Sequence, residues 1–127
     1  MSQGEGKQVN AVEVSLAGML RTPGLVGAVL VDAVTGLVHA RAGNTDAVGD
    51  GPELAELAVL MTDRLNASGA DGDVESVVVT TARWYQVTQS VPRFGDGLLL
   101  CVVFDRERTN LALAVRETSD HARLVLA

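Results

Sequence analysis

Residues 20–38 decide how the chain folds, with the sequence Leu-Arg-Thr-Pro-Gly-Leu-Val-Gly-Ala-Val-Leu-Val-Asp-Ala-Val-Thr-Gly-Leu-Val. At their centre, Leu25–Val31 is a short apolar run rich in valine and flanked by turn-forming residues, which predicts a strand buried on both faces. Residues 32–36 then predict a tight turn, because Asp favours the start of a turn and Gly supplies a positive φ. We expect the returning strand of a hairpin at 37–40 and a polar loop at 41–51.

Helices are predicted in three places. Over Val9–Leu20 apolar residues recur at spacings of three and four, and Thr-Pro-Gly at 22–24 ends that helix. A middle helix begins at Pro52, a residue suited to a first helical turn, and it runs to about Asn66. Its apolar stripe consists of Leu54, Leu57, Ala58, Met61 and Leu65. A final helix is expected from about Asn110 to Leu126.

The remaining segments predict strands. Val74–Thr81 and Trp84–Val91 alternate apolar and polar residues, as half-exposed strands do, whereas Leu98–Phe104 is a second continuous apolar run. Because the links are short, neighbouring strands must be antiparallel. We therefore expect an α/β (α+β) domain with a five-stranded antiparallel sheet, helices on both faces and the order α-β-β-α-β-β-β-α. The runs 25–31 and 98–104 should lie in the middle of the sheet.

Composition limits the kind of protein. With 127 residues and 47% apolar residues, the chain has the size and the apolar content of one globular domain, assigned to 9–127 behind a flexible leader at 1–8. The net charge of −6 argues against nucleic acid or anionic membrane as partner. A single cysteine, no signal peptide and no membrane-spanning run indicate a cytoplasmic protein. One lysine and no isoleucine favour a GC-rich bacterial source.

No arrangement of side chains predicts catalysis, a cofactor or a metal ion. His39 and His121 have no ligand or base at a useful spacing, so both are expected at the surface. Cys101 lies within an apolar strand and is expected to act as a small core residue. The turn at 95–97 lacks the Lys-Ser/Thr of a phosphate-binding loop. We therefore expect no enzyme and no bound nucleotide.

Two features suggest a contact surface. Trp84 and Tyr85 are adjacent on a strand, so they face opposite sides of the sheet. In the middle helix, Val59 and Leu60 lie off the main apolar stripe. Either the stripe is wide and packs deeply, or the helix carries a further apolar face for a partner; the residues alone leave both readings open.

The segment at 20–38, together with Gly-Asp-Gly-Leu-Leu-Leu-Cys-Val-Val-Phe-Asp at 95–105 and Asn-Leu at 110–111, resembles the roadblock/dynein light chain family. The resemblance covers roughly 9–126. It implies a homodimer in which the middle helix and an edge strand pair with their copies. The interface residues it suggests are Leu54, Leu57, Ala58, Val59, Leu60, Met61, Val77 and Val79.

The same resemblance implies a function. Bacterial members of MglB-like type regulate a Ras-like GTPase, and similar proteins of actinobacterial conservons accompany a sensor-kinase-like protein and a small GTPase. The leading hypothesis is thus a non-enzymatic homodimeric interaction module that binds and regulates, or recruits, such a GTPase. The alternative is a sensory domain of PAS or profilin-like architecture that binds a small ligand.

Overall fold

The computed structural model of the protein describes residues 12–70, 72, 74–92 and 97–123. Five strands form one antiparallel sheet in the order β2-β1-β5-β4-β3. They are β1 (Leu25–Asp32), β2 (Val38–Gly43), β3 (Ser76–Thr80), β4 (Trp84–Val91) and β5 (Leu98–Asp105). The helices are an N-terminal helix at 12–18, which a 3-10 turn η1 (Met19–Arg21) extends, then η2 (Thr45–Ala47), α2 (Gly51–Ala67) and α3 (Leu111–His121). The predicted fold class is confirmed.

The two apolar runs lie in the middle of the sheet, as predicted. β5 is the central strand, and its residues from Leu98 to Phe104 are all buried. β1 pairs with β5 on one side and β4 pairs with it on the other. A strand without polar side chains needs cover on both faces, and helices supply that cover here.

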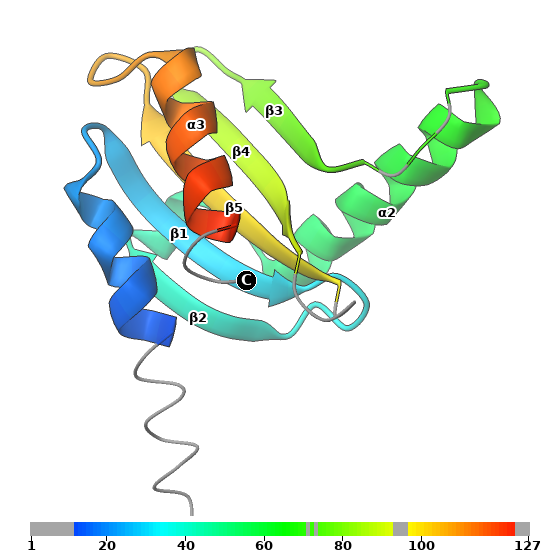
Figure 1. Ribbon diagram of the computed structural model, residues 1–127, viewed down its shortest axis with the longest axis horizontal. Helices are drawn as coiled ribbons and strands as arrows, with labels where there is room; N and C mark the ends of the chain where they lie inside the picture. The colour runs from blue at the N-terminus through cyan, green and yellow to red at the C-terminus, as the bar shows by residue number, and fades with distance from the viewer. Residues whose placement is uncertain (1–11, 71, 73, 93–96, 124–127) are drawn as a thin grey trace, which may run out of the picture.

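Helices cover the two faces of the sheet unequally. The N-terminal helix and α3 lie on one face, and α2 lies on the other (Figure 1). Side chains of β5 alternate between the two layers, so that Leu100 and Phe104 pack with the first pair of helices while Cys101 and Val103 pack on the α2 side. The sheet therefore separates two apolar clusters, and the α2-side cluster is the smaller one.

Trp84 and Tyr85 face opposite sides of the sheet, as their adjacency predicts. Tyr85 packs beside the cluster under α3, and Trp84 packs beside the cluster on the α2 side. Both side chains remain half-buried. Trp84 is thus the aromatic residue on the less covered face.

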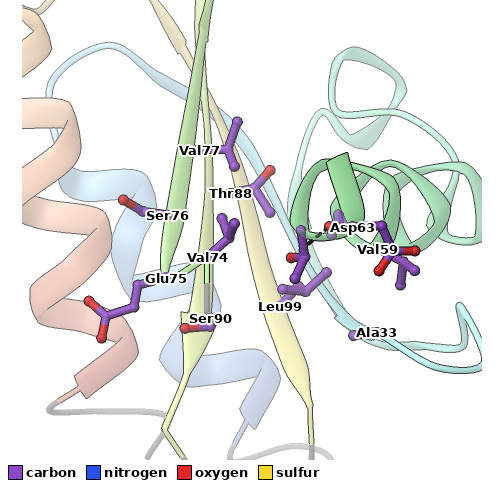
Figure 2. A pocket seen from close by; sticks show the side chains of 12 residues that line it. Ala33, Val59, Asp63, Val74, Glu75, Ser76, Val77, Thr88, Ser90 and Leu99 are labelled. Carbon is purple, nitrogen blue, oxygen red and sulfur yellow. Dashed lines mark hydrogen bonds between the residues drawn. The ribbon is translucent and has the colours of Figure 1, made fainter. Parts of the chain in front are cut away.

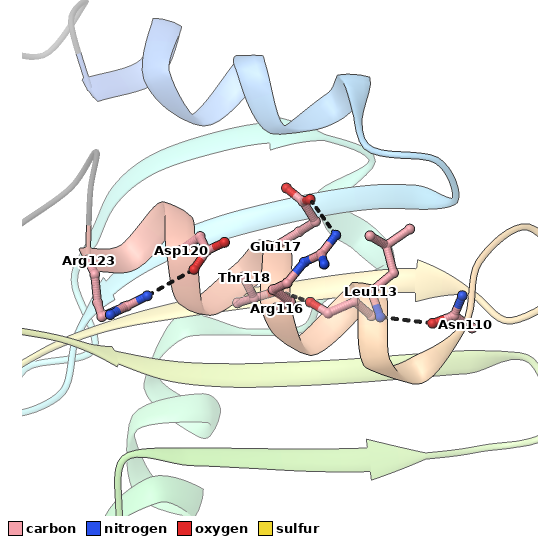
Figure 3. A network of polar contacts seen from close by, with 8 residues as sticks. Asn110, Leu113, Arg116, Glu117, Thr118, Asp120 and Arg123 are labelled. Carbon is pink, nitrogen blue, oxygen red and sulfur yellow. Dashed lines mark hydrogen bonds and ion pairs between the residues drawn. The ribbon is translucent and has the colours of Figure 1, made fainter.

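Side-chain hydrogen bonds define the start and the interior of α3 (Figure 3). The Asn110 Oδ1 accepts a hydrogen bond from the Leu113 amide at 2.9 Å, which is the geometry of a helix N-cap. Thr118 is fully buried, and its hydroxyl donates to the Ala114 carbonyl at 2.8 Å. This bond lets a polar side chain face the core at little cost. Asp120 and Arg123 form an exposed ion pair at 2.9 Å.

The predicted loop at 41–51 is wrong at both ends. β2 continues to Gly43, because Ala42 points into the core and Gly43 still pairs with Gly27. η2 and the first residue of α2 take up more of the segment. The predictions for 1–8, 9–11, 93–96 and 124–127 lie outside the described residues. No helix within the described ranges is long and apolar enough to cross a membrane.

Candidate interaction surface

α2 packs against the sheet only near its start. Gly51, Leu54 and Ala55 are its buried residues. Further along, Leu57, Val59 and Leu60 are 46%, 51% and 50% exposed, and α2 extends past β3, away from the sheet (Figure 1). At 3.6 residues per turn, Leu57 and Val59 lie on opposite flanks of the buried stripe. The helix therefore has more apolar surface than its own sheet covers.

β3 is an edge strand with no feature that would discourage pairing. It pairs with β4 on one side, and no other strand of the described chain lies on its other side. Its sequence, Ser-Val-Val-Val-Thr, contains neither a charged residue nor a proline, and most of its side chains are exposed. Exposed edges are ordinarily protected by Lys, Pro or a bulge. The β3 edge therefore lacks each of these protective features among the described residues.

A groove separates α2 from these outer strands (Figure 2). Its volume is about 250 Å³. Val59, Thr62 and Asp63 line it from α2, and the facing wall consists of Val74, Glu75, Ser76, Val77, Thr88, Ser90 and Leu99. The apolar flank of α2 and the open face of β3 and β4 therefore border one continuous surface.

The eight residues expected at a dimer interface do not all lie on this surface. Leu57, Val59, Leu60 and Val79 are exposed, and Met61 and Val77 are half-buried. Ala58 packs beside the α2-side cluster. Leu54 is a core residue, only 8% exposed, because the first turns of α2 lie directly on the sheet. It serves the core of its own chain.

Sequence reasoning missed Val34. This side chain lies in the turn between β1 and β2 and is 89% exposed. The available signal was an apolar residue in a turn whose other residues are small or polar. Nothing in the sequence indicated that Trp84 is stacked with its neighbour: the Arg83 guanidinium lies over the Trp84 ring, 4.6 Å from the ring centroid. Arg and Trp are residue types that dominate protein interfaces.

Reactive groups are not gathered on this surface. Cys101 is fully buried in β5, and burial raises the pKa of its thiol to about 11. His39 is exposed as expected, but His121 is half-buried between α3 and the N-terminal helix, which corrects the prediction of a surface position. Within the described ranges, no group of three or more His, Cys, Asp and Glu side chains could hold a metal ion.

Solved structures share this architecture. The Streptomyces avermitilis Roadblock/LC7 domain is 26% identical with a TM-score of 0.67, covering 87% of this chain and 90% of its own. Myxococcus xanthus MglB is 15% identical with a TM-score of 0.74, covering 94% and 90%. The chain has a roadblock-like fold of the MglB type. No protein-family profile matches it, and no curated protein sequence matches it significantly.

Two further solved structures of MglB are similar to this chain over most of its length. The gliding protein MglB of Thermus thermophilus is 22% identical with a TM-score of 0.65, over 88% of this chain and 85% of its own. An MglB described with a tetrameric arrangement is 23% identical with a TM-score of 0.70, over 89% and 82%. In that structure, MglB molecules form a tetrameric arrangement.

Proposed function

We propose that this chain is a non-enzymatic, homodimeric interaction domain that binds and regulates, or recruits, a small Ras-like GTPase in a bacterial signalling complex in the cytoplasm. One observation carries the proposal: the exposed apolar flank of α2 lies beside β3, an edge strand without charge or proline. Roadblock-like domains are in general interaction domains.

A second copy fits both parts of this surface. In a two-fold dimer the same patch meets itself, so β3 would pair with its copy and extend the sheet across the interface. The projecting half of α2 would then cover the neighbouring chain. Leu57, Val59, Leu60, Met61, Val77 and Val79 are the side chains available to this contact, with Leu54 and Ala58 supporting them from the core side.

The GTPase rests on the likeness to MglB. Solved MglB structures superpose on most of this chain. The family resemblance described above implies that MglB-like proteins regulate a Ras-like GTPase. A sensor-kinase-like protein is the second partner that this resemblance suggests. Since the chain has a net charge of −6, nucleic acid is a poor alternative partner.

Two measurements test the proposal separately. Light scattering tests the dimer. For the partner, a small Ras-like GTPase from the same source is purified, mixed with the chain in its GDP and GTP-analogue states, and assayed for GTP hydrolysis. We expect a complex in at least one nucleotide state. The lack of a complex in every state would contradict the proposal that a small GTPase is the partner.

The alternative sensory domain would use the groove beside α2. At about 250 Å³ this groove is smaller than pockets that enclose drug-sized ligands, but a second hollow, lined by Arg41, Asp46 and Asp50 among others, measures about 630 Å³, so volume does not separate the two functions. A thermal-shift screen with metabolites distinguishes the two functions. A saturable rise in melting temperature that disappears on Thr88→Leu, which fills the groove, would favour the sensor.

A further inference from the structure

Three exposed arginines gather at the end of the sheet where α3 begins (Figure 1). Arg83 lies in the turn between β3 and β4, and Arg106 and Arg108 lie in the turn between β5 and α3; these three residues are here called the arginine end. The two turns adjoin, because the Arg106 amide donates to the Arg83 carbonyl at 3.0 Å. Three of the ten basic residues of an acidic chain are thus concentrated on two neighbouring turns.

Arg106 is held in place by contacts within its own chain. Its Nη1 donates to the Thr81 carbonyl at 2.6 Å, and its guanidinium lies over the Tyr85 ring, 5.4 Å from the centroid. A carbonyl and an aromatic ring both attract a guanidinium, so together they restrict its rotamers before any partner arrives. A guanidinium has more N–H donors than the bond to Thr81 uses. Arg106 therefore presents positioned donors at the surface.

The arginine end has no ion pair among the described residues. The ion pairs within 4.0 Å in that part of the chain belong to Arg116 and Arg123. Asp105 and Glu107 share the turn between β5 and α3, but the Asp105 Oδ1 accepts a hydrogen bond from the Glu107 amide at 3.0 Å. Planar guanidinium groups match carboxylates through paired hydrogen bonds. The ligand that fits these donors best is thus a carboxylate from outside the described chain.

Arg106 lies away from the surface proposed for the dimer. α2 begins against Gly36, in the turn after β1, whereas the end of β5 pairs with the start of β1, so the two lie at opposite ends of the sheet. Val77 faces α2 across the groove, and Val79 shares its side of β3. Tyr85, under Arg106, packs on the α3 side instead. A ligand on Arg106 therefore leaves the dimer residues of α2 and β3 free.

We propose that the arginine end, with Arg106 at its centre, binds a short segment of a partner protein that is rich in Asp and Glu. Carboxylates of the segment accept hydrogen bonds from Arg106, and Arg83 and Arg108 add attraction nearby. A short segment makes only a local contact. A long polyanion such as nucleic acid would also meet the net charge of −6 of the whole chain, which disfavours it.

A fluorescein-labelled peptide of alternating Glu and Gly serves as the probe, and its anisotropy is followed as the full chain is added at low salt. A Gln-Gly peptide of the same length and a single-stranded oligonucleotide of equal charge are the controls. We expect saturable binding of the Glu-Gly peptide, weakened by added salt because the arginines are exposed. No binding of that peptide, equal binding of the Gln-Gly peptide, or tighter binding of the oligonucleotide would overturn the proposal.

Matched variants locate the site. Arg106→Gln should weaken peptide binding at least about fivefold, and Arg106→Lys about threefold, because lysine keeps the charge but loses the planar set of donors. Glu107→Gln removes a neighbouring negative charge and should strengthen binding. Arg41→Gln makes the same charge change at an exposed position of β2, at one edge of the sheet, and should leave affinity within about twofold. Equal weakening by Arg41→Gln and Arg106→Gln would contradict a site at the arginine end.

Light scattering separates this site from the proposed dimer. Arg106→Gln should keep the wild-type mass and the wild-type circular dichroism while it loses peptide affinity. A lower mass for this variant would mean that the arginine end binds a second copy of the chain, which contradicts the proposal. If the wild-type chain is instead a monomer that still binds the peptide, the dimer fails and the arginine end stands.

Discussion

Gly51, the first residue of α2, lies against Gly36 of the β1–β2 turn: a Cβ on Gly51 would come 2.5 Å from the Gly36 carbonyl oxygen. This contact lets α2 begin directly above the turn and sets where the helix leaves the sheet. Gly51→Ala must displace one of the two backbones. We expect it to lower the free energy of unfolding by about 1–3 kcal/mol, measured by urea denaturation.

The control for this substitution is Gly18→Ala in the N-terminal helix. A Cβ at Gly18 meets no atom within 4 Å, and the residue has a helical φ of −60°. Alanine there should be neutral or stabilising by up to about 1 kcal/mol. Equal losses at both positions would show that the close contact between Gly51 and Gly36 is not the cause.

Alanine substitutions at Leu54 and Leu57 test which side chains of α2 contribute to the stability of the core. Leu54→Ala removes a buried side chain and should cost about 2–4 kcal/mol of stability in the isolated chain. Leu57→Ala, three residues later on an exposed flank, should cost less than about 1 kcal/mol under dissociating dilution. A large loss at Leu57 under those conditions would mean that the helix packs closer to the sheet than described.

Cys101 should be chemically silent in the folded protein. Burial raises the pKa of its thiol to about 11, and the Thr88 hydroxyl lies 3.9 Å from the sulfur. Since the thiolate is the reactive form, a disulfide reagent at about pH 8 should label the native chain far more slowly than the chain in denaturant. Fast native labelling would place Cys101 outside the core.

His121 predicts a pH dependence of stability. Burial between α3 and the N-terminal helix lowers its pKa below the usual value of 6.5, with a backbone bond to Ser15 and the charge of Glu117 acting weakly in the other direction. The unfolded chain therefore binds a proton more readily than the folded one, so stability falls as the pH drops below about 6.5. His121→Gln should flatten this part of the urea-midpoint profile, and an unchanged profile would contradict the burial of His121 as the cause.

The arrangement of the sheet could be predicted because uninterrupted apolar runs permit few positions. Leu98–Phe104 is apolar throughout, so it was expected at the centre, and the short link to β4 made that neighbour antiparallel. Its other neighbour, β1, is distant in sequence, so no link length determined the direction of that pairing. The prediction of a loop at 41–51 was wrong because this segment has no continuous apolar run that would mark the end of β2. Ala42 is too small and too ambiguous a side chain to signal an inward-facing strand position.

The candidate surface was only partly visible in the sequence. Helical periodicity places Leu54, Leu57 and Leu65 on one stripe, but it does not say how far along α2 the sheet continues beneath that stripe. Leu54 faces the sheet and is buried, whereas Leu57 lies on a flank of the buried stripe and is exposed, although Ala58 beside it still packs on the α2-side cluster. Similarly, the half-buried position of His121 depends on where two helices distant in sequence meet.

Self-association through α2 and β3 is the central claim, and light scattering tests it most directly. Val79→Lys places a charge on the β3 edge, and Leu57→Asp places one on the exposed flank of α2, both at positions where the isolated chain tolerates them. At about micromolar concentration the wild-type chain should have at least twice its 13.3 kDa mass, and the double variant should be a folded monomer by circular dichroism. A monomeric wild-type chain, or a double variant that keeps the wild-type mass, would contradict the account.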